Sequence, residues 1–278
     1  MDKDILAELN RILGAKTGLE AWLTENNVTV PEAATVDELV GLLTSVSTSV
    51  IESGTLGQGV VWELYDNGVL VISGHGVAYG LESPFSGRED ILYVVVKEGI
   101  TELGDYVFDR CSMYGIILPD TLKKIGESTF NGCANLKSLF IPSSVNEIDT
   151  AAFSSCNNLK YVEICGSVTE LKRWLLAYCV RLEQIVLPSS LIRIDTRVFL
   201  DCVSLETVVF KGSKSYWDSI EVDYEDDSIS ALLNAKLYCE YDSNADTVDG
   251  WHFAVRDDGT LPPSGVTSTI TLVYTAGG

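Results

Sequence analysis

Apolar residues recur along the middle of the chain with a fixed period. Five of the seven cysteines lie 22, 23, 23 and 23 residues apart, and a large apolar residue stands three positions before each of them. A pair of apolar residues separated by one position follows each cysteine, such as Leu139 and Ile141, and in three copies a proline comes next. Strict alternation predicts a short strand in every copy, which proline ends because it cannot donate to a β-ladder. The pattern therefore predicts a series of similar coils.

A period of this length is typical of a solenoid, because one coil cannot bury its apolar side without its neighbours. Strands of successive coils are expected to pair in parallel, and the cysteines are expected to be buried free thiols, since cysteine packs like a small apolar residue. The other apolar positions should stack in three columns: Phe108, Phe130, Phe153, Leu176 and Phe199; Cys111, Cys133, Cys156, Cys179 and Cys202; and Tyr114, Leu136, Leu159, Leu182 and Leu205.

The repeat resembles a known family. The segment VNEIDTAAFSSCNNLKYVEI (145–164) is similar to the BspA-type leucine-rich repeat, VVWELYDNGVLVISGHGVAYG (60–80) resembles the N-terminal capping hairpin of that family, and YWDSIEVDYEDDSISALLNAKLYC (216–239) resembles its closing segment. The resemblance covers about residues 54–240. It implies a mainly β leucine-rich-repeat solenoid of about five coils of 22–23 residues with capping segments, and a scaffold for binding.

The chain is expected to have six parts. These are a helical module for attachment or oligomerisation at 1–46, a Ser/Thr/Gly-rich linker at 47–59, an N-terminal cap at 60–98, leucine-rich repeats at 99–212, a C-terminal cap at 213–240, and a β-segment at 241–278 whose strands 251–255 and 266–274 form a hairpin. In the first part, helical spacing of apolar residues predicts three short helices. The segment LTENNVTVPEAATVDELVGLL (23–43) resembles a helical module of bacteriophage tail and capsid-surface proteins.

Composition narrows the function classes. Hydrophobic residues make up 46% of the chain and charged residues 21%, which is typical of a folded protein. The 40 acidic residues outnumber the 19 basic ones and give a net charge of −21. Such a surface repels phosphate backbones and anionic membranes, so no nucleic-acid partner is expected. No apolar run reaches the ~18–20 residues that a membrane helix needs, so no membrane span is expected.

Residues that could support catalysis are few. The two histidines, His75 and His252, lie far apart in sequence, and no nucleophile–base pair is recognised, so neither an enzyme nor a cofactor is expected. One weak calcium candidate begins like an EF-hand loop, with Asp242, Asn244, Asp246 and Asp249. That loop lacks the turn glycine at its sixth position and the bidentate glutamate at its twelfth. An acidic linker is the preferred interpretation, and no metal site is predicted.

The remaining candidate site lies on the strands. In each strand, the residues that flank the inward-facing position should face outward and stack along the solenoid at about 4.8 Å per coil. The candidate binding stripe consists of Tyr93, Val95, Ile117, Phe140, Tyr161, Glu163, Val186 and Val209. A contiguous exposed apolar stripe usually marks an interface. The alternative, that the N- or C-terminal part of the same chain covers the stripe, stays open at this point.

The sequence thus favours a non-enzymatic binding protein. The first interpretation is a bacteriophage virion surface protein, a tail or capsid decoration made in the host cytoplasm. Its N-terminal helices would bind other virion proteins, its repeats would bind a protein or cell-surface glycan, and it would form a homo-oligomer, for which a trimer is one option. The alternative is a bacterial BspA-like cell-surface adhesin whose signal peptide is not part of this sequence.

Overall fold

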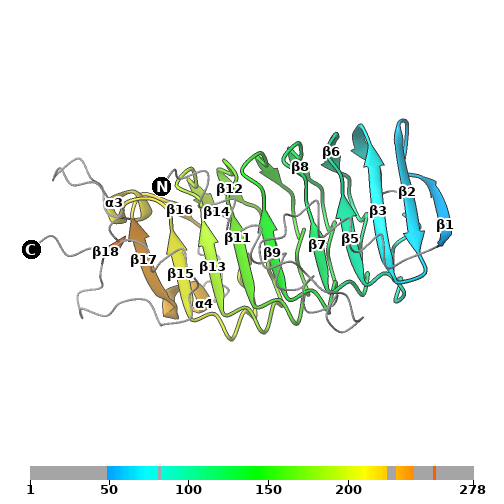
Figure 1. Cartoon of the computed structure of the whole chain (residues 1–278). Helices are drawn as coiled ribbons and strands as arrows, with labels where there is room; N and C mark the ends of the chain where they lie inside the picture. The colour runs from blue at the N-terminus through cyan, green and yellow to red at the C-terminus, as the bar shows by residue number, and fades with distance from the viewer. Residues whose placement is uncertain (1–48, 81–82, 224–229, 241–252, 255–278) are drawn as a thin grey trace, which may run out of the picture.

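The computed structural model describes residues 49–80, 83–223, 230–240 and 253–254 (Figure 1). They form a series of coils in which strands of mostly four to six residues line one side and strands of mostly two residues line another. The strands of the first side, which we call the long sheet, are β1 (Val50–Thr55), β2 (Val60–Tyr65), β3 (Val69–Gly74), β5 (Tyr93–Val96), β7 (Gly115–Ile117), β9 (Ser138–Ile141), β11 (Tyr161–Ile164), β13 (Gln184–Leu187), β15 (Thr207–Phe210), β17 (Lys236–Glu240) and β18 (Phe253–Ala254). The short elements are β4 (Gly76–Ala78), β6 (Ile100–Leu103), β8 (Lys124–Ile125), β10 (Glu147–Ile148), β12 (Glu170–Leu171), β14 (Arg193–Ile194), β16 (Glu221–Val222), α3 (Lys214–Trp217) and α4 (Ser230–Asn234).

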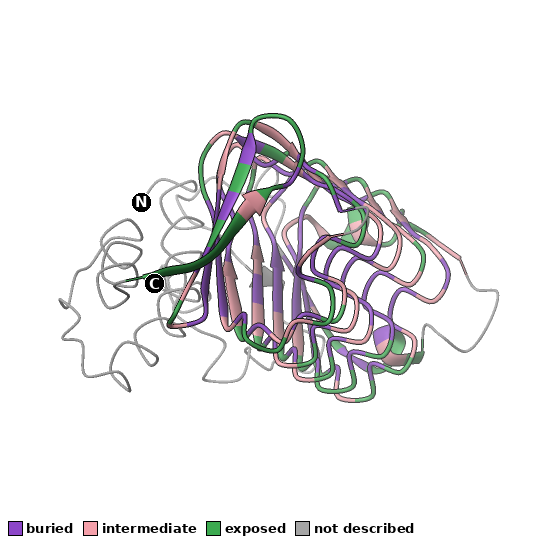
Figure 2. Ribbon diagram, turned by 90° about the vertical axis from the view of Figure 1, so that its right-hand side faces the viewer, coloured by how far each residue is buried: buried purple, intermediate pink, exposed green. Residues whose placement is uncertain are grey.

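The predicted solenoid is confirmed. Strands β3, β5 and β7 pair in parallel, as do β9, β11, β13, β15 and β17. Figure 2, which looks along the solenoid, shows buried residues running through every coil, while exposed residues gather at the corners and in the N-terminal hairpin. The predicted capping hairpin is formed by β2 and β3, which pair antiparallel across a turn at Asp66–Gly68.

Strand β1 differs from the prediction, because its residues fall in the predicted linker at 47–59. It pairs antiparallel with β2 as an additional strand of the cap. Gly54 permits this close pairing, since a Cβ at that position would lie 2.9 Å from the indole of Trp62. A Ser/Gly-rich composition is typical of linkers, but here the small residues make room for a buried tryptophan.

The coil pattern also begins one turn earlier than the cysteines indicate. Phe85 stacks on Phe108 with ring centroids 5.7 Å apart, and this stack continues through Phe130 and Phe153 at 5.4 and 5.6 Å. Arg88 occupies the position that cysteine has in the later coils. Counting cysteines therefore misses this coil, whereas the phenylalanine stack includes it.

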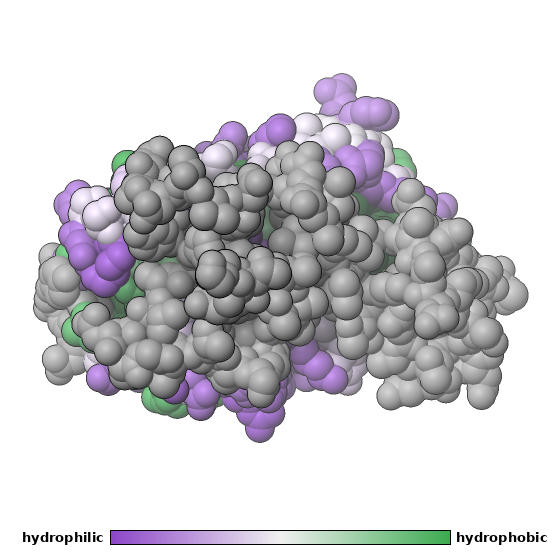
Figure 3. Space-filling view, turned by 60° about the vertical axis from the view of Figure 1, so that its left-hand side comes forward, coloured by the Kyte–Doolittle hydropathy of each residue, from purple (hydrophilic) through white to green (hydrophobic). Residues whose placement is uncertain are grey.

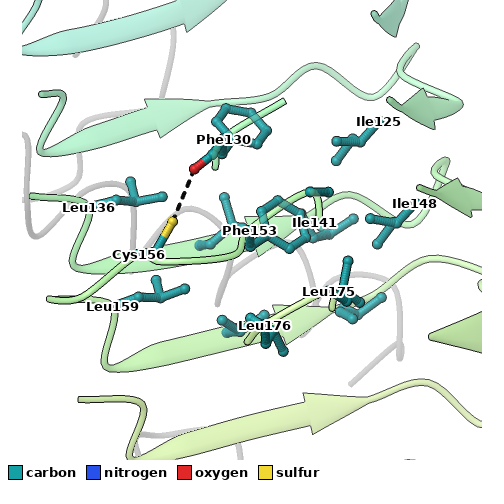
Figure 4. Close-up of a cluster of buried hydrophobic side chains, with 14 of the residues drawn as sticks. Ile125, Phe130, Leu136, Ile141, Ile148, Phe153, Cys156, Leu159, Leu175 and Leu176 are labelled. Atoms are coloured by element: carbon teal, nitrogen blue, oxygen red, sulfur yellow. Dashed lines mark hydrogen bonds between the residues drawn. The ribbon is translucent and has the colours of Figure 1, made fainter. Parts of the chain in front are cut away.

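The cysteine column is buried, as predicted, and it also makes hydrogen bonds (Figure 4). The Sγ of Cys156 lies 3.2 Å from the carbonyl oxygen of Phe130 in the preceding coil and donates to it. The same contact is repeated along the column at 3.1–3.2 Å, from Cys133 to Phe108, from Cys179 to Phe153 and from Cys202 to Leu176. The thiol therefore fills space and also gives a buried carbonyl group a second donor, since the carbonyls of Phe108, Phe130 and Leu176 already accept from the backbone N–H of the cysteine in their own coil.

These thiols are expected to be unreactive in the folded protein. Burial raises the pKa of Cys111 and Cys202 to about 12 and the pKa of Cys156 well above its ordinary value, so almost no thiolate forms near neutral pH. A maleimide reagent should leave the five column cysteines unlabelled in native protein and label them after denaturation, as read by intact mass. Rapid native labelling of most of them would contradict the register of the coils.

One copy is a residue shorter than the others, and the structure shows where the residue is missing. Met113 is fully buried, whereas Tyr114 is 41% exposed. Methionine therefore fills the place in the third apolar column that was predicted for Tyr114. The gap therefore lies between Cys111 and the strand. At the same coil boundary the long sheet is interrupted, because β7 ends one sheet and β9 begins the next.

The short strands form a second side. They too fall into two sheets, one ordered β10-β8-β6-β4 and the other β12-β14-β16, with the interruption between β10 and β12. Charged side chains link these coils: Lys172 lies 3.0 Å from Glu147 and 3.2 Å from Asp149, and Arg193 contacts carboxylates of two coils. Partly exposed ion pairs contribute little individually, so this side depends mainly on its buried residues.

The third side is a turn in which left-handed residues recur at two positions of each coil. At the first position they are Tyr106, Ser128, Ala151, Trp174 and Arg197, with φ between 51° and 63°. Their backbone N–H groups donate to carbonyls of the next coil, from Tyr106 to Glu127, from Ser128 to Thr150, from Ala151 to Arg173 and from Trp174 to Thr196. This ladder crosses the boundaries at which the two strand-bearing sides are interrupted.

The ends of the chain are described only in part. Strand β18 pairs antiparallel with β17. The second half of the predicted C-terminal hairpin, 266–274, lies outside the described residues, as do the predicted helical module at 1–46 and the whole acidic segment at 241–252.

Candidate recognition surface

The outward face of the long sheet brings the predicted site residues together. The parallel register places Glu163 beside Phe140 on one side and Val186 on the other, and it places Tyr161 beside Ser138 and Gln184. We call the first of these rows the outer column. Its members are Val95, Ile117, Phe140, Glu163, Val186, Val209 and Tyr238.

The shared face agrees with the prediction, but the expected exposure is wrong for most of the column. Val95, Val186 and Val209 are 3%, 6% and 3% exposed, and Glu163 is only 1% exposed. Each side chain lies between neighbours from the coils on either side. Towards the C-terminal end these contacts create a second apolar cluster, separate from the main core, in which Val186, Val209 and Tyr238 pack together with Tyr161.

Two of the accessible places on this face are aromatic. Phe140 and Tyr161 are half-buried, and their ring centroids lie 5.4 Å apart. Tyr114 is exposed and lies 6.3 Å from Tyr93, and the ammonium group of Lys137 lies 5.8 Å above its ring. Aromatic rings offer large contact areas at little cost in side-chain entropy, which suits a binding surface.

A buried polar cluster lies next to the aromatic pair. One carboxylate oxygen of Glu163 lies 2.8 Å from the Nζ of Lys211 and 3.4 Å from the Sγ of Cys165, and the other accepts from the hydroxyl of Tyr161 at 2.9 Å. Burial of a charge is costly without compensation. Here an ammonium group, a phenol and a thiol together satisfy the carboxylate.

The position of Lys211 explains how it reaches Glu163. Lys211 and Cys165 stand where other copies have the strand-ending proline, and Pro188 occupies that position in the coil between them. The lysine side chain therefore spans a whole coil, over buried Pro188, to reach a carboxylate 48 residues away in sequence.

The cluster also alters the acidity of its neutral members. Burial raises the pKa of Tyr161, and the adjacent Glu163 carboxylate raises it further. Burial raises the pKa of Cys165 to about 12, with a further contribution from Glu163. Tyr161 and Cys165 therefore stay protonated near neutral pH and act as hydrogen-bond donors, and the thiol has no nucleophilic character.

The other candidates are not brought into this surface. His75 is exposed in the turn between β3 and β4, and His252 and the calcium candidate at 242–249 lie outside the described residues. Among the residues that the structure describes, no group of three metal-ligating side chains occurs. Within the same ranges, no helix is long and apolar enough to cross a membrane. Where the described surface is visible in Figure 3 it is mainly hydrophilic, with small hydrophobic areas between.

The repeat region has a recognised family. Residues 82–219 match the BspA type Leucine rich repeat region in six copies, one more than the cysteines indicate. That part of the chain is therefore a BspA-type leucine-rich repeat region, as the sequence predicted. A comparison with curated protein sequences finds no match.

Several solved structures are similar. A leucine rich cell surface protein from Faecalibacterium prausnitzii is 26% identical with a TM-score of 0.49, and the match covers 62% of this chain and 43% of that one. A leucine-rich repeat protein from Bacteroides ovatus is 23% identical with a TM-score of 0.41, covering 59% and 55%. The pneumococcal vaccine antigen PcpA is 16% identical with a TM-score of 0.42, covering 59% and 51%. This chain thus spans about half the length of these proteins.

Proposed function

We propose that this chain is a non-enzymatic recognition protein of a bacterial surface, which binds a protein or a glycan through the outward face of its long sheet. The observation that carries the proposal is the accessible aromatic centre of that face, formed by the pair Phe140 and Tyr161 and by Tyr114 with Lys137 above it. Phe140 and Tyr161 lie on strands of the solenoid and Tyr114 directly precedes β7, so little conformational entropy is lost when a ligand binds there.

The composition of the face supports recognition rather than catalysis. Its one buried polar cluster among the described residues consists of groups that satisfy each other, and Cys165 and Tyr161 are held protonated. Leucine-rich-repeat solenoids serve as binding scaffolds because their surface residues can vary while the core is retained.

A bacterial surface is favoured over a virion as the location. The family match covers the repeat region. The adhesin interpretation rests on that same family, so the match supports it. The resemblance to virion proteins rests on residues 23–43 alone, which lie outside the described residues. Attachment to other virion proteins through those helices has no further support, and we do not include it in the proposal.

Phe140→Glu in the full chain tests the proposal. We expect the variant to lose affinity about 30-fold, or about 2 kcal/mol, because a charge replaces an aromatic anchor at the centre of the contact. Stability should change by only about 0.5 kcal/mol, since the ring points away from the core. Binding would be measured by interferometry on immobilised extracellular-matrix proteins and glycans, and stability by thermal unfolding.

The matched control is Val203→Glu, which makes the same kind of change at an apolar residue that is 78% exposed and away from the long sheet. It should bind like the unmodified protein. If Phe140→Glu and Val203→Glu bind equally well, the binding surface lies elsewhere. If Phe140→Glu instead lowers the unfolding free energy by several kcal/mol, then Phe140 belongs to the core.

A further inference from the structure

The N-terminal end of the long sheet carries an open strand edge. Strand β1 pairs with β2 on one side, and no described residue pairs with its other side. The opposite end of the long strands differs, because β18 lies antiparallel against β17 there. An unpaired edge presents backbone donors and acceptors to any strand of suitable chemistry.

The hydrogen-bond pattern identifies which groups are open. The N–H of Leu56 donates to the carbonyl of Val60 at 3.1 Å, and the register of β1 and β2 pairs Gly54 with Trp62 and Ser53 with Glu63. In an antiparallel ladder, residues that bond to the partner strand alternate with residues that point away from it. Leu56 and Gly54 therefore bond to β2, and the N–H and C=O of Ser53 and Thr55 point to the open side.

The side chains around this edge are unusually apolar for a free surface. Val50 is 45% exposed, Ile51 is 58% exposed, and Val61 on the adjacent strand is 46% exposed. Natural edge strands are usually protected by lysine, proline or a β-bulge; β1 contains no lysine or proline, and its one register irregularity lies between Val50 and Glu52, at its N-terminal end. Its one charged residue, Glu52, is already engaged by Arg88 at 2.9 Å.

A buried donor beneath the edge strand lacks a partner. Trp62 is 5% exposed, and within the described part of the chain its Nε1 has no hydrogen-bond partner. The same atom lies 2.9 Å from where a Cβ on Gly54 would stand, which places it directly under β1. Buried donors are normally paired, so the described residues leave the cap beneath β1 with one unsatisfied polar group.

We propose that β1 pairs antiparallel with β1 of a second copy of this chain, about a two-fold axis through Ser53. Both Ser53 residues then face each other with their open N–H and C=O groups, Glu52 lies opposite Gly54, and Ile51 lies opposite Thr55. This register sets no two carboxylates directly opposite each other. It joins the two long sheets end to end and leaves the outer column of each copy on its own sheet.

Sedimentation velocity of the full chain tests the pairing. A pair of six-residue strands is a small interface, so the dimer should be populated only as the concentration rises from low micromolar to several hundred micromolar. Its mass should approach twice the 30.3 kDa of one chain. The net charge of −21 on each copy opposes association, so added salt should strengthen the dimer by screening that repulsion. A chain that stays monomeric at all these concentrations and at high salt overturns the proposal.

Two variants locate the contact. Ser53→Pro removes an N–H that points away from β2, and Ile51→Lys places a charge on the exposed edge; each should raise the dissociation constant about tenfold or more. Val203→Lys, which adds the same charge far from the edge, should leave it unchanged. Dimers that persist in both edge variants place the contact elsewhere and overturn the proposal.

A cross-link tests the register. Ser53→Cys should form a disulfide-linked dimer under mild oxidation, because the two-fold axis brings the two added thiols opposite each other. Val203→Cys, an exposed thiol away from the edge, should remain mainly monomeric under the same conditions. If both variants cross-link at equal rates, the contact is random collision and the proposed register is wrong.

Discussion

Lys211→Met is expected to lower the free energy of unfolding by about 2–3 kcal/mol. The substitution leaves the Glu163 carboxylate, whose side chain is 2% exposed, without the ammonium group that lies 2.8 Å away. Removing one partner of a fully buried pair costs about 3–5 kcal/mol, and the lower figure used here allows for the 26% exposure of the lysine side chain. Urea denaturation followed by fluorescence would measure the change.

The double variant Lys211→Met/Glu163→Val tests whether the loss of stability comes from the unpaired charge of Glu163. It removes both charges and restores the apolar residue that most copies have at the position of Glu163. Replacement of a buried ion pair by apolar residues is often close to neutral, so the double variant should recover most of the lost stability. Equal losses in the single and double variants would mean that the lysine stem, rather than its charge, stabilises this face.

Phe153→Ala is expected to lower the free energy of unfolding by about 3–5 kcal/mol, more than Lys211→Met does. The ring has no exposed surface and stacks on Phe130 at 5.6 Å, so its removal leaves a cavity between the coils. The comparison is Phe140→Ala, which removes the same side chain from the outward face and should cost much less. Similar losses at the two positions would show that the outward face is packed like the core.

The coils could be predicted from the sequence because the residues that form the core of each coil recur with a fixed period. Phenylalanine and cysteine recur at fixed positions, and a solenoid contacts only its neighbours, so local spacing is enough to define the fold. The prediction went wrong where one signal was missing or displaced. Arg88 replaced the cysteine that would have revealed the first coil, and the one-residue gap placed Tyr114 where Met113 packs.

The candidate surface was harder to predict than the fold. Alternation within a strand predicts which residues share a face, and the register of the strands places the outer column in one row. The exposure of an outward-facing residue depends on how far side chains of neighbouring coils cover it. Alternation within one strand carries no information about those neighbours. The contact between Glu163 and Lys211 joins residues two coils apart, so no pattern within one repeat could reveal it. A useful signal was the lysine itself, which breaks the run of prolines at that position.

The interruptions in the two strand-bearing sides have a mechanical consequence. The long sheet stops between β7 and β9, but the short strands β8 and β10 still pair across that boundary. One coil further on, the short strands stop between β10 and β12 while β9 and β11 remain paired. The two interruptions thus fall at different coil boundaries. A pulling force along the solenoid therefore acts on at least one intact strand ladder at each of these boundaries. If the protein is anchored at one end and pulled at the other, neither of these two boundaries lacks strand pairing on both sides at once.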